Sequence, residues 1–409
     1  MERVVITGLG AISSLGIGAA NNFNQLMAGV SGIGLLELPL PRQISNCAAA
    51  QIKFPLPEIV KKNELPMFDR VSLLAMIAAN EAVTQSGLME EPSKLAASGV
   101  FWGTGMGGAQ TLENGYVDLF IGNKGRVRPL SIVASMNNAA AGLVALRCGF
   151  GGTVNTYSSA CVSSAQAIGE AYRHIRHGYA DRILAGGSEA MLTYGVMNAW
   201  SAMRVMATAN PTDVKQSCQP FSDHRSGLVL GEAGAAVMLE SLSTAKARGA
   251  NILAELVGYG SSNDATHMTN PNPAGQARAM KNAIAQSGLS IADIHYINAH
   301  GAGTAAGDLA ETESIKLVFG DSAKKLMVSS TKSMHGHTLG AAGALEFVIT
   351  AQIVRTQQVP PTAFLDRADP LCDLDYVPLV GRRNQNVNVA MSNSFAFGGS
   401  NSVLIVKSF

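Results

Sequence analysis

The chain has 409 residues, of which 47% are hydrophobic and 14% charged, and its formal net charge at pH 7 is +1. Such a length and apolar content allow a large buried core, which excludes a disordered protein. The small net charge argues against nucleic acid as the main partner, and the lack of any run of about 18 apolar residues argues against a membrane span.

Apolar, β-branched runs alternate with alanine-rich helical runs, which predicts an α/β fold with mostly parallel strands. The predicted strands form two sets of five. The first set is 3–9, 99–103, 153–159, 181–186 and 234–240, and the second set is 253–260, 294–299, 326–330, 387–392 and 402–407. Segments 36–67 and 109–130 lack clear periodicity, so we expect them to be insertions that cover the core.

Cys161 stands where a strand-like run ends and a helix-like run over 162–177 begins. The unpaired N–H groups and the positive dipole end of a helix N-terminus favour a thiolate and offer donors to an oxyanion. Both features suit a nucleophile. An isolated cysteine is more often a buried apolar residue, so this signal needs support from other segments.

Two later segments each place histidine and glycine at the end of a predicted strand. His300 lies in 298–304, and His337 lies in 332–340. Glycine lets a backbone approach a substrate closely, and imidazole handles protons or donates hydrogen bonds near neutral pH. A nucleotide-binding loop is another reading of the glycine-rich string 103–108, but its acidic partner and βαβ context are missing.

With these segments in view, the chain resembles the β-ketoacyl-acyl-carrier-protein synthases of the thiolase superfamily, in particular the elongating Cys-His-His kind. The similar blocks run through essentially the whole chain and include 4–10, 103–108, 185–190 and 393–401. The resemblance implies a duplicated five-layer αβαβα fold with mostly parallel mixed sheets. It places the nucleophile in a first half, 1–250, and the two histidines in a second half, 251–409.

The resemblance also implies a reaction, the decarboxylative condensation of an acyl thioester with malonyl-acyl-carrier protein. Cys161 would hold the acyl group, while His300 and His337 would donate hydrogen bonds to the malonyl thioester oxygen as carbon dioxide leaves. The backbone N–H groups of Cys161 and Phe397 would form an oxyanion hole, and Phe397 would also act as a gate. Lys332 would tune the protonation and orientation of the histidines.

Several nearby polar residues have supporting or structural interpretations. Glu346 lies in an apolar helix-like run, where an unpaired carboxylate is costly, so we expect it to pair with Lys332. The family spacing Lys-x-x-x-Gly-His selects His337 rather than His335. We expect Asp308 and Glu311 to cap or pair with backbone near the first histidine motif. Four further histidines are expected to be structural: His174, His177, His224 and His295.

The substrates would arrive on the phosphopantetheine arm of acyl carrier protein, and we expect no other cofactor and no metal. Thr304 and Thr269 would hydrogen-bond this arm. Ala302 stands where the bacterial fatty-acid enzymes usually have threonine, which removes one hydroxyl. Met106 and Trp200 occupy positions that line or close the acyl pocket in the family.

Two further features concern the loop and the rim of the expected site. Ala396 replaces a glycine in the mobile Phe-Gly-Phe-Gly-Gly loop, where a Cβ makes positive φ expensive. Carrier protein is acidic, and family positions predict a basic docking rim formed by Arg126, Arg128, Arg204, Lys61 and Lys62. Glu64 and Pro66 thin this rim, which indicates a dedicated carrier protein or a shifted docking patch.

The same residues discriminate against other members of the superfamily and against other classes. Degradative thiolases use a second cysteine in the C-terminal turn that here carries Phe395 and Phe397, and chain-initiating synthases have asparagine in place of His337. A non-catalytic chain-length factor lacks the nucleophile. A Cys-His protease predicts neither a second histidine motif nor a duplicated half.

Pathway, assembly and location complete the expectations. Fatty-acid elongation and a specialised polyketide pathway, such as aryl polyene synthesis, both stay open as interpretations. We expect a homodimer, or a heterodimer with a homologue that resembles a chain-length factor. The cysteines are odd in number and show no C-x-x-C or metal-ligand spacing, and no secretory leader is evident, so we expect a cytoplasmic protein. They are Cys47, Cys148, Cys161, Cys218 and Cys372.

Overall fold

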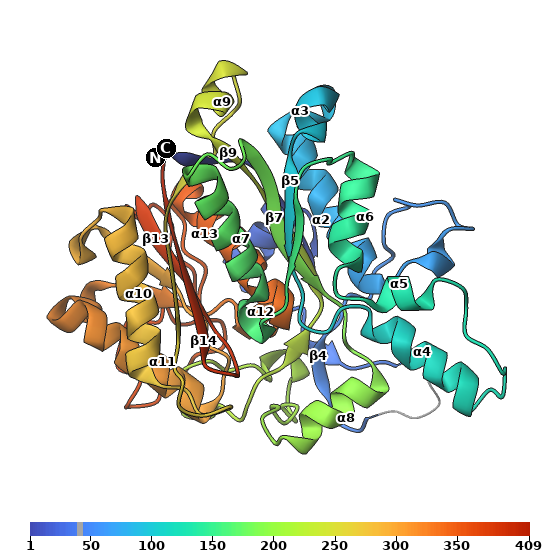
Figure 1. Ribbon diagram of the computed structural model, residues 1–409. Helices are drawn as coiled ribbons and strands as arrows, with labels where there is room; N and C mark the ends of the chain where they lie inside the picture. Colours follow the sequence, from blue (N-terminus) through green and yellow to red (C-terminus); the bar gives the residue numbers. More distant parts are fainter. Residues whose placement is uncertain (39–43) are drawn as a thin grey trace.

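A long mixed β-sheet organises the chain in the computed structural model, which describes residues 1–38 and 44–409 (Figure 1). The strands contributed by the first part of the chain are β1 (Val4–Ser13), β2 (Gly16–Ile17), β5 (Gly99–Gly103), β6 (Val154–Tyr157), β7 (Arg182–Glu189) and β9 (Ala233–Ser241). Those from the second part are β10 (Ala254–Asn263), β11 (Tyr296–Asn298), β12 (Met327–Ser329), β13 (Val389–Phe395) and β14 (Ser400–Lys407). All ten predicted strands are therefore confirmed.

The order of these strands shows the predicted duplication. Along the sheet the order is β12-β11-β13-β14-β10-β1-β9-β7-β5-β6, and β2 pairs with β1 off this path. The five strands that each half contributes to this path can be numbered in chain order and then read from the outer edge of the sheet inward. Both halves then show the same order, which is third, second, fourth, fifth and first strand. The two first strands pair antiparallel at the centre, with Val4 opposite Leu256. The site residues that follow the middle strands of each half thus approach from opposite sides of one pseudo-twofold axis.

Helices on and between the half-sheets complete the five layers (Figure 1). Helices α7 (Ser163–Arg176) and α13 (Ala342–Thr356) lie between the half-sheets and share one large apolar core with them. The outer face of the first half packs against α2 (Arg70–Ser86) and α6 (Ala139–Cys148). The outer face of the second half packs against α10 (Pro273–Ser287) and α11 (Ala305–Phe319). Because α13 is central, nearly all of its residues are buried, as expected for a helix without a solvent face.

Shorter elements surround this frame. The other helices are α1 (Ala19–Met27), α3 (Pro92–Ala96), α4 (Ala109–Phe120), α5 (Ser131–Ser135), α8 (Tyr194–Ala202), α9 (Leu242–Ala247) and α12 (Lys332–His335). A small second sheet consists of β3 (Gly34–Leu35), β4 (Ala48–Ala50) and β8 (Leu230–Gly231). In the part of the chain that the structure describes, no helix is long and apolar enough to cross a membrane.

The prediction for the two aperiodic segments was half right. Segment 36–67 is largely irregular around β4, although its residues 39–43 lie outside the described part. Segment 109–130 instead begins with a regular helix, α4. Its residues Leu112, Tyr116 and Phe120 recur every four positions, a helical spacing that the prediction overlooked, and because all three are exposed this face does not pack on the core. The division at residue 250 falls between α9 and β10 and stays a prediction.

Candidate active site

Cys161 lies in a tight turn, Ala160–Val162, immediately before α7. Ala160 has a φ of 50°, a left-handed conformation that turns the chain sharply from β6 into the helix. Cys161 is only 5% exposed to solvent. Burial raises the pKa of the Cys161 thiol to about 12, although the nearby Lys332 opposes this rise. The expectation that the helix N-terminus favours a thiolate is therefore wrong, because desolvation outweighs the helix end.

His337 lies directly against the sulfur. Its Nε2 is 3.0 Å from the Sγ of Cys161. The N–H of Leu339 donates to Nδ1 of the same ring at 3.3 Å, so a neutral His337 carries its hydrogen on Nε2. Burial, together with the positive charge of Lys332, holds the pKa of His337 well below its usual value. The ring is thus a neutral donor whose N–H points at the nucleophile.

His300 completes the trio from the end of β11. Its ring centroid is 5.2 Å from that of His337, and the two planes are nearly perpendicular at 84°. Burial and Lys332 also hold the pKa of His300 well below its usual value. The Nδ1 atom of His300 has no hydrogen-bond partner among the described residues. Both imidazoles are therefore neutral at physiological pH and able to donate one hydrogen bond each.

A buried ion pair stands behind the two histidines. Lys332, on α12, pairs with Glu346, on α13, and neither side chain is exposed to solvent. Burial raises the pKa of Glu346 to about 7, while the Lys332 ammonium opposes this effect. The ammonium in turn disfavours protonation of His300 and His337. The ion pair thus keeps a fixed positive charge beside rings that have to remain neutral.

Two acidic residues of α11 hold the loop that carries His300. Glu311 accepts hydrogen bonds from the backbone N–H groups of His300 and Gly301, at 2.9 and 2.8 Å. Asp308 accepts from the N–H of Gly303 at 3.1 Å. These contacts agree with the structural interpretation of both carboxylates. His335 is buried elsewhere, against Thr331 and the carbonyl of Gly336, and does not line the cavity around the nucleophile.

A cavity of about 160 Å³ opens onto Cys161, His300 and His337. Six further predicted or discussed positions also line it: Trp200, Thr269, Ala302, Thr304, Ala396 and Phe397. Met106 does not line this cavity. It lines a second one, of about 250 Å³, together with Gly195, Val196, Ala199, Trp200 and Met203. Trp200 is thus the residue that the two cavities share.

The loop between β13 and β14 closes one side of the first cavity. The ring of Phe397 stacks on that of Trp200, with centroids 6.0 Å apart and planes inclined by 25°. The left-handed conformations of this loop fall on Gly398 and Gly399, with φ of 84° and 74°. Ala396 does not adopt positive φ here, so the expected backbone penalty for its Cβ is absent in this conformation.

Sequence comparison agrees with this geometry. The family model described as β-ketoacyl synthase, N-terminal domain, matches residues 1–245, and the C-terminal domain model matches residues 253–366. The chain is 42% identical over 407 residues to Nodulation protein E of Rhizobium sp. (strain N33), covering 99% of each protein. It is 38% identical over 411 residues to 3-oxoacyl-acyl-carrier-protein synthase 2 of Staphylococcus aureus (strain COL), covering 100% of this chain and 99% of the relative. The chain belongs to the β-ketoacyl synthase family.

Solved structures of other ketosynthases share the fold over the full chain. One is a type II polyketide synthase acyl carrier protein in complex with its ketosynthase, bound to the hexaketide. It is 32% identical with a TM-score of 0.91, and the match covers 100% of both chains. Another is the ishigamide ketosynthase/chain length factor, which is 30% identical with a TM-score of 0.92, covering 100% of this chain and 99% of that one. The thiolase-like fold is thereby confirmed.

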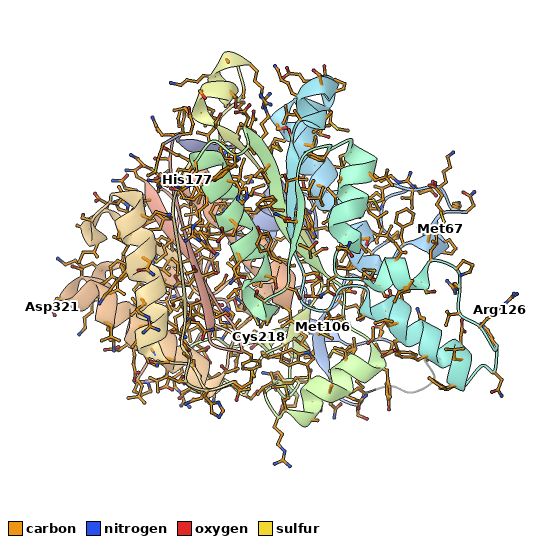
Figure 2. All side chains as sticks on the ribbon, in the orientation of Figure 1. Met67, Met106, Arg126, His177, Cys218 and Asp321 are labelled. Atoms are coloured by element: carbon orange, nitrogen blue, oxygen red, sulfur yellow. The ribbon has the colours of Figure 1, made fainter. Side chains whose placement is uncertain are left out.

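The basic residues predicted for carrier docking lie in three separate places on this ketosynthase. Arg126 and Arg128 are exposed on the loop after α4, with Arg126 at the outer edge of the molecule (Figure 2). Lys61 and Lys62 are exposed in the irregular segment before α2. Arg204 follows α8 and precedes Val205, which lines the nucleophile cavity. Of the five basic residues, Arg204 is the one whose neighbour in the sequence lines the nucleophile cavity.

Sequence reasoning missed three acidic residues around this ketosynthase site. Glu189 ends β7, and its buried carboxylate accepts hydrogen bonds from the N–H groups of Gly105, Met106 and Gly340. Asp264 lines the nucleophile cavity. Glu113, on α4, reaches the start of α8. The sequence could have pointed to Glu189, because this residue closely follows the predicted strand 181–186. Only the tertiary structure shows which backbone N–H groups Glu189 and Glu113 bind.

Proposed function

We propose that the protein catalyses the decarboxylative condensation of an acyl thioester with malonyl-acyl-carrier protein, giving β-ketoacyl-acyl-carrier protein and carbon dioxide. The observation that carries this proposal is the 3.0 Å approach of the His337 Nε2 to the Cys161 sulfur, with His300 beside it in the same cavity. A nucleophile and two neutral donors are the groups that an acyl transfer followed by enolate formation requires.

In the first half-reaction the sulfur of Cys161 attacks the acyl carbonyl. The carrier thioester bond breaks, the acyl group becomes bonded to Cys161, and the carrier leaves as a thiol after gaining the proton of the cysteine. The N–H of His337 stabilises negative charge on sulfur as this proton departs. In the described part of the chain, the Phe397 N–H makes no hydrogen bond, which leaves it free to donate to the oxyanion with the N–H of Cys161.

In the second half-reaction the malonyl group loses its carboxylate as carbon dioxide. The electron pair of the broken carbon–carbon bond passes into the thioester, and His300 and His337 donate hydrogen bonds to the resulting enolate oxygen. The enolate carbon then attacks the acyl carbonyl, the bond from that carbonyl to the sulfur of Cys161 breaks, and the departing thiolate takes up a proton from solvent. Because burial, assisted by the positive charge of Lys332, keeps both rings neutral, they act as donors and do not become proton reservoirs.

We propose acyl carrier protein as the partner that delivers both substrates, with no cofactor besides its phosphopantetheine arm. Thr304 and Thr269 line the nucleophile cavity where this arm would enter, and Ala302 contributes no hydroxyl there. The five basic residues of the predicted rim would meet the acidic carrier. The solved relative in complex with an acyl carrier protein supports this assignment.

Two pathways fit this chemistry. Fatty-acid elongation is supported by the similarity to a 3-oxoacyl-acyl-carrier-protein synthase 2. A specialised polyketide pathway is supported by the polyketide ketosynthase structures and by the flat Trp200–Phe397 stack, which suits a planar conjugated chain. We further propose a cytoplasmic dimer, either of identical chains or with a homologue resembling a chain-length factor. The five cysteines are all free, as a reducing compartment requires.

The test separates the two half-reactions. Incubation with an acyl-carrier protein, followed by digestion and mass spectrometry, should place the acyl group on Cys161. His300→Ala and His337→Ala should lose malonyl decarboxylation more severely than acylation of Cys161. An adduct on Cys47, Cys148, Cys218 or Cys372 in place of Cys161 would refute the assignment of the nucleophile. Equal loss of both half-reactions in folded histidine variants would refute the division of labour.

A further inference from the structure

Glu113 makes a bidentate contact with the first turn of α8. From its position on α4, its Oε1 accepts a hydrogen bond from the N–H of Tyr194 at 2.8 Å. Its Oε2 accepts from the N–H of Gly195 at 2.6 Å. The residue that precedes α8, Thr193, makes no capping hydrogen bond with its side chain. A carboxylate from another helix therefore does what a local cap usually does, and it complements the positive end of the helix dipole.

The residue that α8 presents to the site is Trp200. This ring stacks on Phe397 beside the nucleophile and also lines the second cavity, which contains Met106. In this position Trp200 borders both a space of about 160 Å³ and one of about 250 Å³. A small movement of α8 would change how far an acyl chain on Cys161 can extend toward Met106. The position of this helix thus bears directly on chain selection.

The structure also shows that the contact is close and anchored. A Cβ on Gly195 would lie 2.9 Å from the Oε2 of Glu113, so the glycine gives the carboxylate room to reach both amides. The α4 helix is itself fixed near its start, because Asp69 accepts a hydrogen bond from the N–H of Thr111 at 2.8 Å. Glu113 therefore projects from a fixed support onto α8 rather than moving freely with it.

We propose that Glu113 is a positioning residue for acyl-chain selection: it fixes α8 and so sets the position of Trp200 between the two cavities. This inference rests on the proposed condensing function, because it assigns the acyl chain to these cavities. It does not place Glu113 in contact with substrate or with the reacting atoms. Loss of the bidentate contact should loosen the indole wall and leave the chemistry at Cys161 in place.

The decisive variant is Glu113→Gln, which keeps the size of the side chain but cannot accept from both amides without turning its own NH₂ toward one of them. We expect the ratio of kcat/KM for long against short acyl-carrier substrates to rise about fivefold, the effect of losing one well-formed hydrogen bond. Asp118→Asn is the matched control, since it removes one charge from the same helix and alters only an exposed ion pair with Lys124. The control should keep the parental ratio.

Acrylamide quenching supplies a readout that does not depend on turnover. The chain has two tryptophans, and Trp102 is fully buried, so increased quenching reports on Trp200. We expect Glu113→Gln to increase quenching in the full-length protein, whereas Asp118→Asn should not. Gly195→Ala displaces the same carboxylate from the opposite side without changing charge, and it should shift both readouts in the same direction. The double variant should add little to either single one.

The outcomes separate this inference from the proposed function. If the parental protein condenses malonyl substrates, and Glu113→Gln and Gly195→Ala alter neither the length profile nor the quenching, the positioning role is refuted. If both variants increase quenching but the length profile stays parental, Glu113 positions Trp200 but selection lies elsewhere, and the inference also fails. If the parental protein lacks condensing activity, the proposed function fails first, whatever quenching shows.

Discussion

The Cys161 sulfur gives the clearest case of competing influences on one group. A helix end and Lys332 favour its thiolate, but burial dominates and raises its pKa to about 12. The folded pKa lies above that of a free cysteine, so the thiolate fraction at pH 8 is smaller than in an unfolded chain. We expect alkylation of Cys161 by iodoacetamide to rise about tenfold per pH unit between pH 7 and 9. A plateau near pH 8 would contradict this prediction and indicate a lowered pKa.

Lys332 and Glu346 form a second residue-level test, because both are fully buried. Lys332→Ala leaves an uncompensated carboxylate, and we expect it to lower the free energy of unfolding by about 3–5 kcal/mol. The double variant Lys332→Met with Glu346→Leu removes both charges, so urea denaturation should show most of this stability restored. Decarboxylation should stay impaired in the double variant, because the histidines lose a positive charge that acts together with burial to disfavour their protonation. Restored activity would show that the pair serves stability alone.

The β13–β14 turn is the element on which the gate depends, and its glycines are not equivalent. Gly399 has a φ of 74°, and a Cβ there would lie 2.9 Å from the Cβ of Asp264. We expect Gly399→Ala to strain the turn by about 1–2 kcal/mol and to lower the rate of Cys161 acylation. Ala396→Gly is the matched control three positions earlier, where φ is not positive, and it should change the rate little. Equal effects of both substitutions would mean that flexibility matters and the left-handed position does not.

At the level of elements, the sequence predicted the strands better than the connections. Alternating apolar and helical runs located all ten strands, because a buried sheet imposes a strong local pattern. The α4 helix was missed although Leu112, Tyr116 and Phe120 recur every four positions; all three are exposed, so this spacing does not mark a core-facing side. Motif spacing located Cys161, His300, Lys332 and His337, which the fold brings together. The carboxylates of Glu113 and Glu189 act across distant segments, and no local pattern reports such contacts.

The protonation states of Cys161, His300 and His337 could not be predicted from the sequence, because they depend on burial. A helix N-terminus is visible in a pattern of residues, but the degree of desolvation depends on how both halves close over the sulfur. Cys161 belongs to the first half, and the histidines come from the second. Each half supplies only part of the chemistry, so the site exists because the duplicated halves pack face to face through α7 and α13. Burial of the ion pair and neutrality of the histidines follow from that packing.

The first half of the molecule has a free sheet edge and several exposed apolar side chains. Strand β6 is the last strand of the long sheet, and among the described residues no strand pairs with its outer edge. Val154 on this strand is 39% exposed, and Ile132 on α5 is 69% exposed. Phe120 and Ile121, at the end of α4, are each 77% exposed. A free strand edge and exposed apolar side chains each favour association with a second chain.

We therefore expect the protein to be a dimer at micromolar concentration, with these apolar side chains buried. Ile132→Glu should produce monomers, because a twofold interface would bury the new carboxylate twice against apolar groups. Light scattering on a sizing column measures the mass. The matched control is Leu317→Glu, which places the same charge on the 56% exposed Leu317 of α11, on the opposite side of the molecule (Figure 1). The control should stay dimeric. A monomeric parent that instead co-purifies with a homologue lacking the nucleophile would indicate the heterodimer, and an Ile132→Glu protein that keeps the dimer mass would show that association uses another surface.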